Sequence, residues 1–137
     1  MDRDKRWERV QLAYDAMTLG EGLQAADAES ALQAAYDRDE NDEFVKPSCV
    51  DGGHPVSDGD AMIMFNFRPD RAREITRAFA ADEFDGFERK KKIRDLCYIC
   101  MTQYDAEMPN VQVEMCIRDR ITGISIPSGF TYGSYIH

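Results

Sequence analysis

Two arginines, Arg68 and Arg71, lie three residues apart where an apolar run ends and a helix is expected to begin. Arginine carries a planar, permanently charged fork that binds phosphate or carboxylate through two hydrogen bonds. A helix start adds free backbone N–H groups and the positive end of the helix dipole. This pattern predicts an anion-binding site. The alternative is an amphipathic helix with solvated arginines paired with Asp70 and Glu74, and spacing alone leaves both interpretations open.

A second charged cluster precedes the first expected helix. Residues 1–7 read Met-Asp-Arg-Asp-Lys-Arg-Trp, with Asp4 as the expected N-cap of that helix. Arg3 lies outside the helix, from where its side chain could reach a ligand. By composition alone, a solvated helix start explains the same residues.

The remaining residues that could do chemistry favour structural roles. Cys97 and Cys100 form a lone Cys-x-x-Cys inside an apolar strand, where residues three apart face opposite sides. Zinc would need a second ligand pair at similar spacing, so we interpret the two cysteines as buried thiols. His54 and His137 show no metal-ligand spacing, and neither a glycine-rich phosphate loop nor a Gly-x-Ser-x-Gly motif is found. We therefore expect no metal site made by this chain alone.

Length and charge narrow the class of protein. A chain of 137 residues is long enough for one domain with a hydrophobic core. The net charge of -9 argues against a general nucleic-acid binder. No apolar run approaches the ~20 residues that cross a bilayer, and the first residues lack a signal-peptide pattern. The four cysteines show no disulfide-framework spacing, and we expect a cytoplasmic protein with no membrane or nucleic-acid partner.

Helical and strand patterns alternate along the chain. A first helix has an apolar stripe at Trp7, Val10, Tyr14 and Met17, and glycines at 20 and 22 should end it. Asp27 should cap a second helix, whose stripe is Ala28, Ala31, Leu32, Ala35 and Tyr36. Residues 37–43 are acidic and read as a solvated turn.

Strands are expected over residues 44–50, 61–67 and 96–101. The second of these is a continuous apolar run, which predicts a strand buried on both faces. Pro69 should occupy the first position of the helix that follows. Helices alternating with buried strands predict an α/β layered domain with a central sheet flanked by helices.

Four motifs together resemble a known family, the cofactor-independent phosphoglycerate mutases. They occur in the family's order across about the first 110 residues: Met-Asp-Arg-Asp-Lys-Arg-Trp (1–7), Asn-Asp-Glu-Phe-Val-Lys-Pro (41–47), Phe-Asn-Phe-Arg-Pro-Asp-Arg (65–71) and Met-Thr-Gln-Tyr-Asp (101–105). The resemblance implies an isomerase of glycolysis that interconverts 2-phosphoglycerate and 3-phosphoglycerate through a phosphoserine intermediate. It also implies two Mn²⁺ ions and substrate-binding roles for Arg3, Arg68 and Arg71, with Asp70 as a hypothetical local orienter.

The resemblance further implies that other parts of the enzyme lie elsewhere. The family's nucleophilic serine and metal ligands belong to a phosphatase-like domain, for which this sequence has no matching motif. We therefore expect no catalytic residue and no metal ligand here, and we interpret Met1 as an internal methionine.

The chain is accordingly interpreted as a fragment. Residues 1–113 are assigned to part of the substrate-binding domain, and residues 114–137 to a tail of non-family origin. The fold should be incomplete because it is truncated, with exposed apolar surface, poor solubility and no activity alone. The alternative is a free-standing anion-binding α/β module that acts with a partner chain.

Overall fold

The computed structural model describes residues 4–108 and 110–113 of the chain. Their elements, in order, are α1 (Trp7–Leu19), β1 (Leu23–Ala25), α2 (Ala28–Asp37), β2 (Ser48–Val50), β3 (Ala61–Met64), α3 (Arg73–Ala80), β4 (Cys97–Cys100) and β5 (Val111–Val113). The strands form two parallel sheets, β1-β2 and β3-β4-β5. The predicted α/β class, with sheets and flanking helices, is confirmed.

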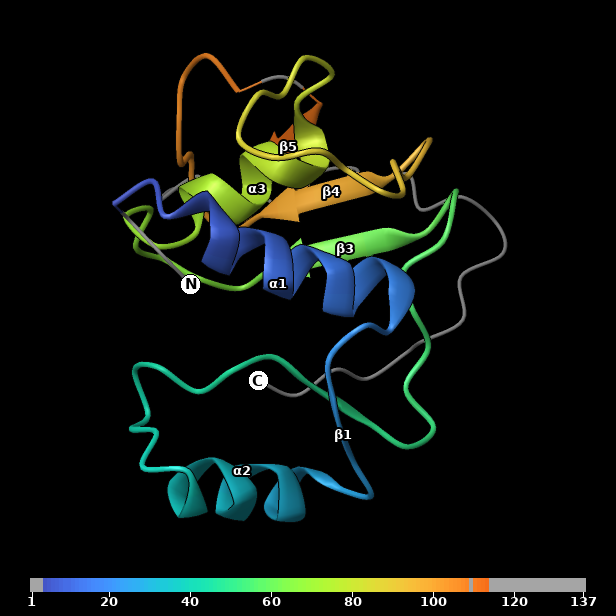
Figure 1. Cartoon of the computed structure of the whole chain (residues 1–137). Helices are drawn as coiled ribbons and strands as arrows, with labels where there is room; N and C mark the ends of the chain where they lie inside the picture. Colours follow the sequence, from blue (N-terminus) through green and yellow to red (C-terminus); the bar gives the residue numbers. More distant parts are fainter. Residues whose placement is uncertain (1–3, 109, 114–137) are drawn as a thin grey trace.

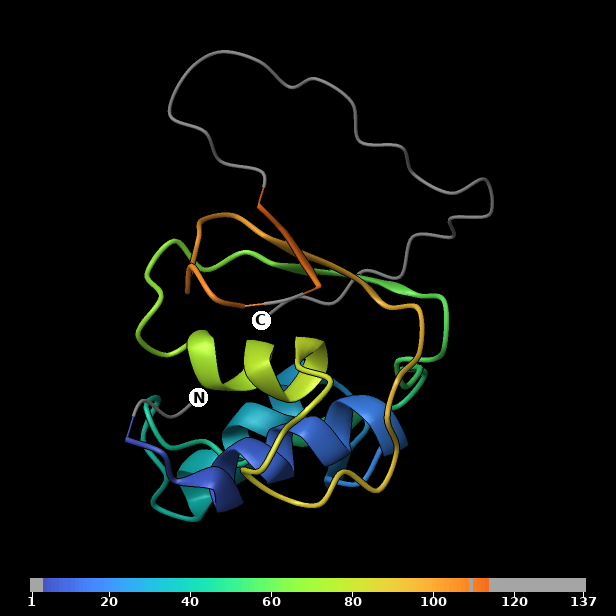
Figure 2. The same cartoon turned by 90° about the horizontal axis from the view of Figure 1, so that it is seen from above.

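The elements gather into two units (Figure 1). The larger unit contains α1, α3 and the three-stranded sheet, and the smaller unit contains α2, β1 and β2. Seen from above, α1 and α3 both lie on the same side of the three-stranded sheet (Figure 2). Within the described residues, no helix is long and apolar enough to cross a membrane.

The core lies between the two helices and the central strand β4. The ring of Phe79 on α3 lies 4.7 Å from that of Tyr14 on α1 and 6.0 Å from that of Tyr98 on β4. All three side chains are buried, and the Tyr14 hydroxyl donates a hydrogen bond to the Lys91 carbonyl at 2.7 Å. Apolar burial of this kind supplies most of the free energy of folding. The fold of the larger unit therefore depends on the contact between α3 and its two neighbours.

Helix α1 matches its expected apolar stripe but not its expected start. Val10 and Tyr14 are buried, and Gly20 ends the helix with a φ of 70°. Asp4 does not cap the helix, because Arg6 is the residue before its first turn and makes no side-chain capping bond. The physical reason lies at Lys5, whose φ of 57° is left-handed and prevents the helix from beginning earlier.

Helix α2 has the predicted cap and a mostly uncovered apolar stripe. The Ser30 amide donates to Asp27 Oδ1 at 2.7 Å, as a helix N-cap requires. Ala35 is buried, whereas Leu32 and Tyr36 remain 43% and 44% exposed. The smaller unit has only two short strands beside α2, which is too little surface to cover the whole stripe.

Strand β3 corrects the prediction of a strand buried on both faces. It is shorter than expected and lies at the edge of the described sheet, while β4 occupies the centre. Ile63 is 57% exposed, and Phe65 and Phe67, which follow the strand, are 67% and 51% exposed. The apolar run therefore predicted the position of the strand in the sequence correctly, but it did not predict that the strand lies at the edge of the sheet. The expectation of exposed apolar surface is met here.

Candidate functional site

The candidate site is built from two loops at the carboxyl edge of the three-stranded sheet. Residues 65–72 follow β3, and residues 101–105 follow β4. The two strands are parallel with Met64 opposite Cys100, so their loops leave the sheet side by side. Ligands of open α/β sheets commonly bind at this edge.

Side chains of the second loop hold the backbone of the first. The Tyr104 hydroxyl donates to the carbonyls of Met64, at 3.1 Å, and of Asn66. The Thr102 hydroxyl donates to the Phe67 carbonyl at 3.0 Å. Burial raises the pKa of Tyr104 to about 12, so its hydroxyl keeps the proton that it donates. The end of β3 and the start of the first loop are thus held at three carbonyls, those of Met64, Asn66 and Phe67, before the arginines.

Arg68 and Arg71 precede helix α3 instead of lying in its first turn. Pro69 does not open the helix, which begins at Arg73. The Arg73 amide donates to the Pro69 carbonyl at 3.0 Å, so a single turn over residues 69–73 leads into the helix. The predicted helix start is wrong by four residues, because residues 70–72 form a turn and the helix itself begins at Arg73.

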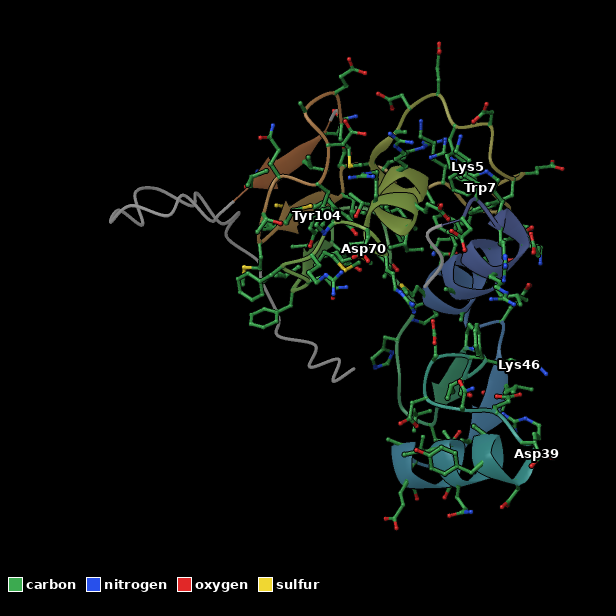
Figure 3. All side chains as sticks on the ribbon, turned by 90° about the vertical axis from the view of Figure 1, so that its left-hand side faces the viewer. Lys5, Trp7, Asp39, Lys46, Asp70 and Tyr104 are labelled. Carbon is green, nitrogen blue, oxygen red and sulfur yellow. The ribbon has the colours of Figure 1, made fainter. Side chains whose placement is uncertain are left out.

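Arg68 is open to solvent. Its side chain is 87% exposed, and Nη2 lies 3.6 Å from Asp70 Oδ2. This distance fits an ion pair but exceeds a hydrogen bond, and an exposed pair of this kind holds a side chain only weakly. Asp70 lies on the side of the larger unit that faces the smaller one, which carries Lys46 and Asp39 (Figure 3). Arg68 is therefore accessible to an incoming anion.

Arg71 binds a carboxylate of the smaller unit. Its Nη2 donates to Glu43 Oε1 at 2.5 Å, and the arginine side chain is 36% exposed. Glu43 was expected in a solvated acidic turn; the turn is exposed, but this carboxylate has a specific partner. The guanidinium already makes the kind of charge-assisted bond that phosphate or carboxylate ligands require.

The segment of residues 41–47 makes a second contact near the site. Phe44, next to Glu43, lies under the Arg9 guanidinium of α1, which is 5.2 Å from the ring centroid. Such cation–π contacts stabilise a pair modestly. Arg3, the third predicted site residue, lies outside the described residues, so its position relative to Arg68 and Arg71 stays a prediction.

Two other arginines near the site have structural roles. Arg73 Nε donates to the Tyr104 carbonyl at 3.1 Å, and Arg77 forms an ion pair with Asp105. The hydrogen bond from Arg77 lowers the pKa of the Asp105 carboxyl below its usual value. These contacts fasten the start of α3 to the loop after β4.

Cysteine and metal chemistry find no support in the described part of the chain. Cys97 and Cys100 lie in β4 as free thiols, with Cys100 buried and Cys97 half-buried. Burial raises the pKa of the Cys100 thiol to about 11, which disfavours the reactive thiolate. Across residues 4–108 and 110–113, no three His, Cys, Asp or Glu side chains gather as metal ligands would. These residues do not fit the Mn²⁺ ions that the resemblance implies.

Comparison with known proteins decides the family. The family described as BPG-independent PGAM N-terminus (iPGM_N) matches residues 1–106, more than half of the chain. This chain belongs to the BPG-independent phosphoglycerate mutase family. The 2,3-bisphosphoglycerate-independent phosphoglycerate mutase of Acetivibrio thermocellus is 56% identical over 117 residues, and enzyme 2 of Methanosarcina acetivorans is 58% identical over 111 residues.

The matched region is a small part of these mutases. The alignment with the A. thermocellus mutase covers 82% of this chain and 23% of that protein, and the one with the M. acetivorans mutase covers 77% and 21%. A crystal structure of Leishmania mexicana phosphoglycerate mutase superposes with a TM-score of 0.71 at 32% identity. It covers 78% of this chain and 21% of that one. The chain thus spans about a fifth of its mutase relatives.

Sequence reasoning missed the residues that support the arginines of this mutase segment. Tyr104 and Thr102 were noted only as part of a family motif, and Glu43 was expected to be solvated. The signal for Tyr104 was its place just after β4, because parallel strands bring their carboxyl ends to one edge. Nothing in the sequence pairs Glu43 with Arg71, which lies 28 residues away.

Replacing Tyr104 with phenylalanine tests how firmly the first loop is held. The change removes the hydroxyl that serves two backbone carbonyls, and we expect it to lower the free energy of unfolding by about 1–3 kcal/mol. Urea denaturation of the 137-residue chain measures this change. Tyr36→Phe is the matched control, because it removes a hydrogen bond from an exposed hydroxyl to Asp42 and should cost less than about 0.5 kcal/mol. Equal losses in the two variants would contradict the assigned role of Tyr104.

Proposed function

We propose that this chain is the substrate-binding part of a 2,3-bisphosphoglycerate-independent phosphoglycerate mutase, with Arg68 and Arg71 binding the phosphoglycerate and Arg3 as a third arm. The observation that carries the proposal is the placement of Arg68 and Arg71. Both lie on one loop at the carboxyl edge of a parallel sheet, where Arg71 already binds a carboxylate. Membership of the mutase family supports the same substrate class.

The proposed task of these arginines is to retain the substrate. Interconversion of 2-phosphoglycerate and 3-phosphoglycerate through a phosphoserine requires that the glycerate stay bound while the phosphoryl group leaves and returns. Arginine forks suit this task because they bind both carboxylate and phosphate without a change of protonation. The serine and two Mn²⁺ ions would be supplied by a phosphatase-like domain, where the metal ions would activate the nucleophile and stabilise phosphoryl charge. We propose a cytoplasmic location, as expected for glycolysis.

Arg71 must exchange partners for this function. Its present partner, Glu43, is an exposed carboxylate on the smaller unit, and the pair is only partly shielded from water. Exposed ion pairs are weak, so an incoming phosphate dianion can displace the carboxylate at low cost.

A chimera tests the proposal. In this chimera, residues 1–113 replace the matching segment of the A. thermocellus mutase, and activity is measured with 3-phosphoglycerate in the absence of 2,3-bisphosphoglycerate. We expect turnover by the chimera and none by the 137-residue chain, with or without Mn²⁺. Turnover by the 137-residue chain would overturn the fragment interpretation. A folded but inactive chimera, with phosphoglycerate bound tightly by the isolated chain, would favour the free-standing anion-binding module.

A further inference from the structure

A buried carboxylate in the first turn of α3 has no role in the site as described above. Glu74 is only 6% exposed. Its Oε1 accepts a hydrogen bond from the Lys5 backbone amide at 2.8 Å, and its buried Oε2 has no hydrogen-bond partner among the described residues. A buried carboxylate is costly unless its contacts compensate for lost hydration. Glu74 therefore calls for an explanation beyond helix stability.

The contact joins segments that are far apart in sequence. Lys5 and Glu74 are separated by 69 residues, and Figure 1 shows the start of the described chain beside α3. Lys5 has a left-handed φ of 57°, a conformation that residues with a side chain seldom adopt. The carboxylate binds the backbone of Lys5, so the bond fixes the path of the chain and not the lysine side chain.

The two ends of the anchor are close in sequence to the proposed substrate arginines. Arg3 precedes Lys5 by two residues, and Glu74 follows Arg71 by three. Two peptide units span at most about 7 Å, so an anchor at Lys5 restricts the range open to Arg3. The opposite end of the anchor is rigid, because Arg73 beside Glu74 is tied to the Tyr104 carbonyl.

We propose that Glu74 is a positioning residue for substrate binding. Its carboxylate holds the backbone of Lys5 at α3, and this restricts the point of the chain from which Arg3 extends. This inference rests on the proposed function and adds to it a residue that touches no substrate. Its contribution is to pre-organise the binding site, which reduces the entropy lost when the anion is bound.

Kinetics of the chimera test the inference. Glu74→Ala should raise the KM for 3-phosphoglycerate roughly ten-fold and change kcat by less than about three-fold, because the arginines remain but one loses its anchor. Glu74→Gln should restore KM to within about three-fold of the unmodified chimera, since its amide oxygen can still accept the Lys5 N–H. Asp15→Asn is the matched control. Asp15 is likewise 6% exposed and also has a buried oxygen without a partner, but it lies on α1 beside Lys90, and its KM should be unchanged.

Amide hydrogen exchange in the 137-residue chain tests the anchor without relying on activity. Glu74→Ala should speed exchange of the Lys5 amide at least about ten-fold. The Ser30 amide, which is bound by the Asp27 cap, is the internal control and should be unaffected. Glu74→Asp replaces the alanine variant if that variant fails to fold. Its shorter side chain keeps the charge but moves the carboxylate away from the Lys5 amide, so it should also raise KM.

The outcomes separate this inference from the proposed function. An unchanged KM in Glu74→Ala or Glu74→Asp overturns the positioning role, provided that Arg71→Ala raises KM. Equal impairment by alanine and glutamine also overturns it, because the hydrogen bond would then not be the cause. If neither Arg68→Ala nor Arg71→Ala changes KM, the proposed function is overturned. The positioning role then falls with it, even if Glu74→Ala speeds hydrogen exchange of the Lys5 amide.

Discussion

Replacement of Arg71 by alanine is expected to lower kcat/KM of the chimera for 3-phosphoglycerate roughly 100-fold. The change removes a guanidinium that would donate charge-assisted hydrogen bonds to the substrate, a loss of about 3 kcal/mol. Arg71→Lys should recover only part of the activity, because an ammonium keeps the charge but lacks the planar fork. Steady-state kinetics over a range of 3-phosphoglycerate concentrations measures the effect.

Arg38→Ala is the matched control for this prediction. The Arg38 side chain is 36% exposed, as is that of Arg71, and it also binds a glutamate, with Nε 3.0 Å from Glu40 Oε1. It lies at the end of α2 in the smaller unit, away from the loops after β3 and β4. We expect kcat/KM to change less than about two-fold. Similar losses in Arg38→Ala and Arg71→Ala would show that activity responds to surface charge in general and not to the proposed site.

The largest expected loss of stability follows from Phe79→Ala. Phe79 is 6% exposed, and its ring packs between Tyr14 of α1 and Tyr98 of β4. Truncation leaves a cavity where both helices and the sheet meet, and such changes cost about 3–5 kcal/mol. For a single domain this is a large share of the free energy of unfolding, so much of the population should unfold.

Urea denaturation followed by fluorescence of Trp7, the only tryptophan, measures this effect. Trp7 packs edge-on against Phe84, with ring centroids 5.2 Å apart, so its emission reports packing in the larger unit. Phe65→Ala removes the same side chain from a position that is 67% exposed, and we expect a change below about 0.5 kcal/mol. A smaller loss for Phe79→Ala than for Phe65→Ala would contradict the core described here.

Local signals in the sequence were sufficient for most helices and strands. The Asp27 cap, the stripe of α1 and the stop at Gly20 were predicted correctly, because each depends on neighbouring residues. Strand β1 was missed, since three residues are too few to show a period. The exposure of Ile63 was also missed, because an apolar run does not reveal whether a strand has neighbours on both sides.

The candidate site was predicted only in part, because sequence patterns show local features and not contacts between distant segments. Arg68 and Arg71 stand out because residue type and spacing alone suggest anion binding. Glu43 and Glu74 do not, since their contacts join segments 28 and 69 residues apart and follow from the tertiary fold. A carboxylate that anchors a distant backbone amide looks in sequence like any other charge on a helix.

The tie between Tyr104 and the loop after β3 has a consequence for how this region can vary among related sequences. Both acceptors are main-chain oxygens, those of Met64 and Asn66, so the tie is independent of the side chains at those two positions. Substitutions there can alter the shape and polarity around the arginines without releasing the loop. Tyr104 itself cannot be substituted without losing the tie, because no other residue carries a hydroxyl on a rigid ring of that length. Selection would accordingly preserve Tyr104, while the side chains at positions 64 and 66 could be substituted more freely.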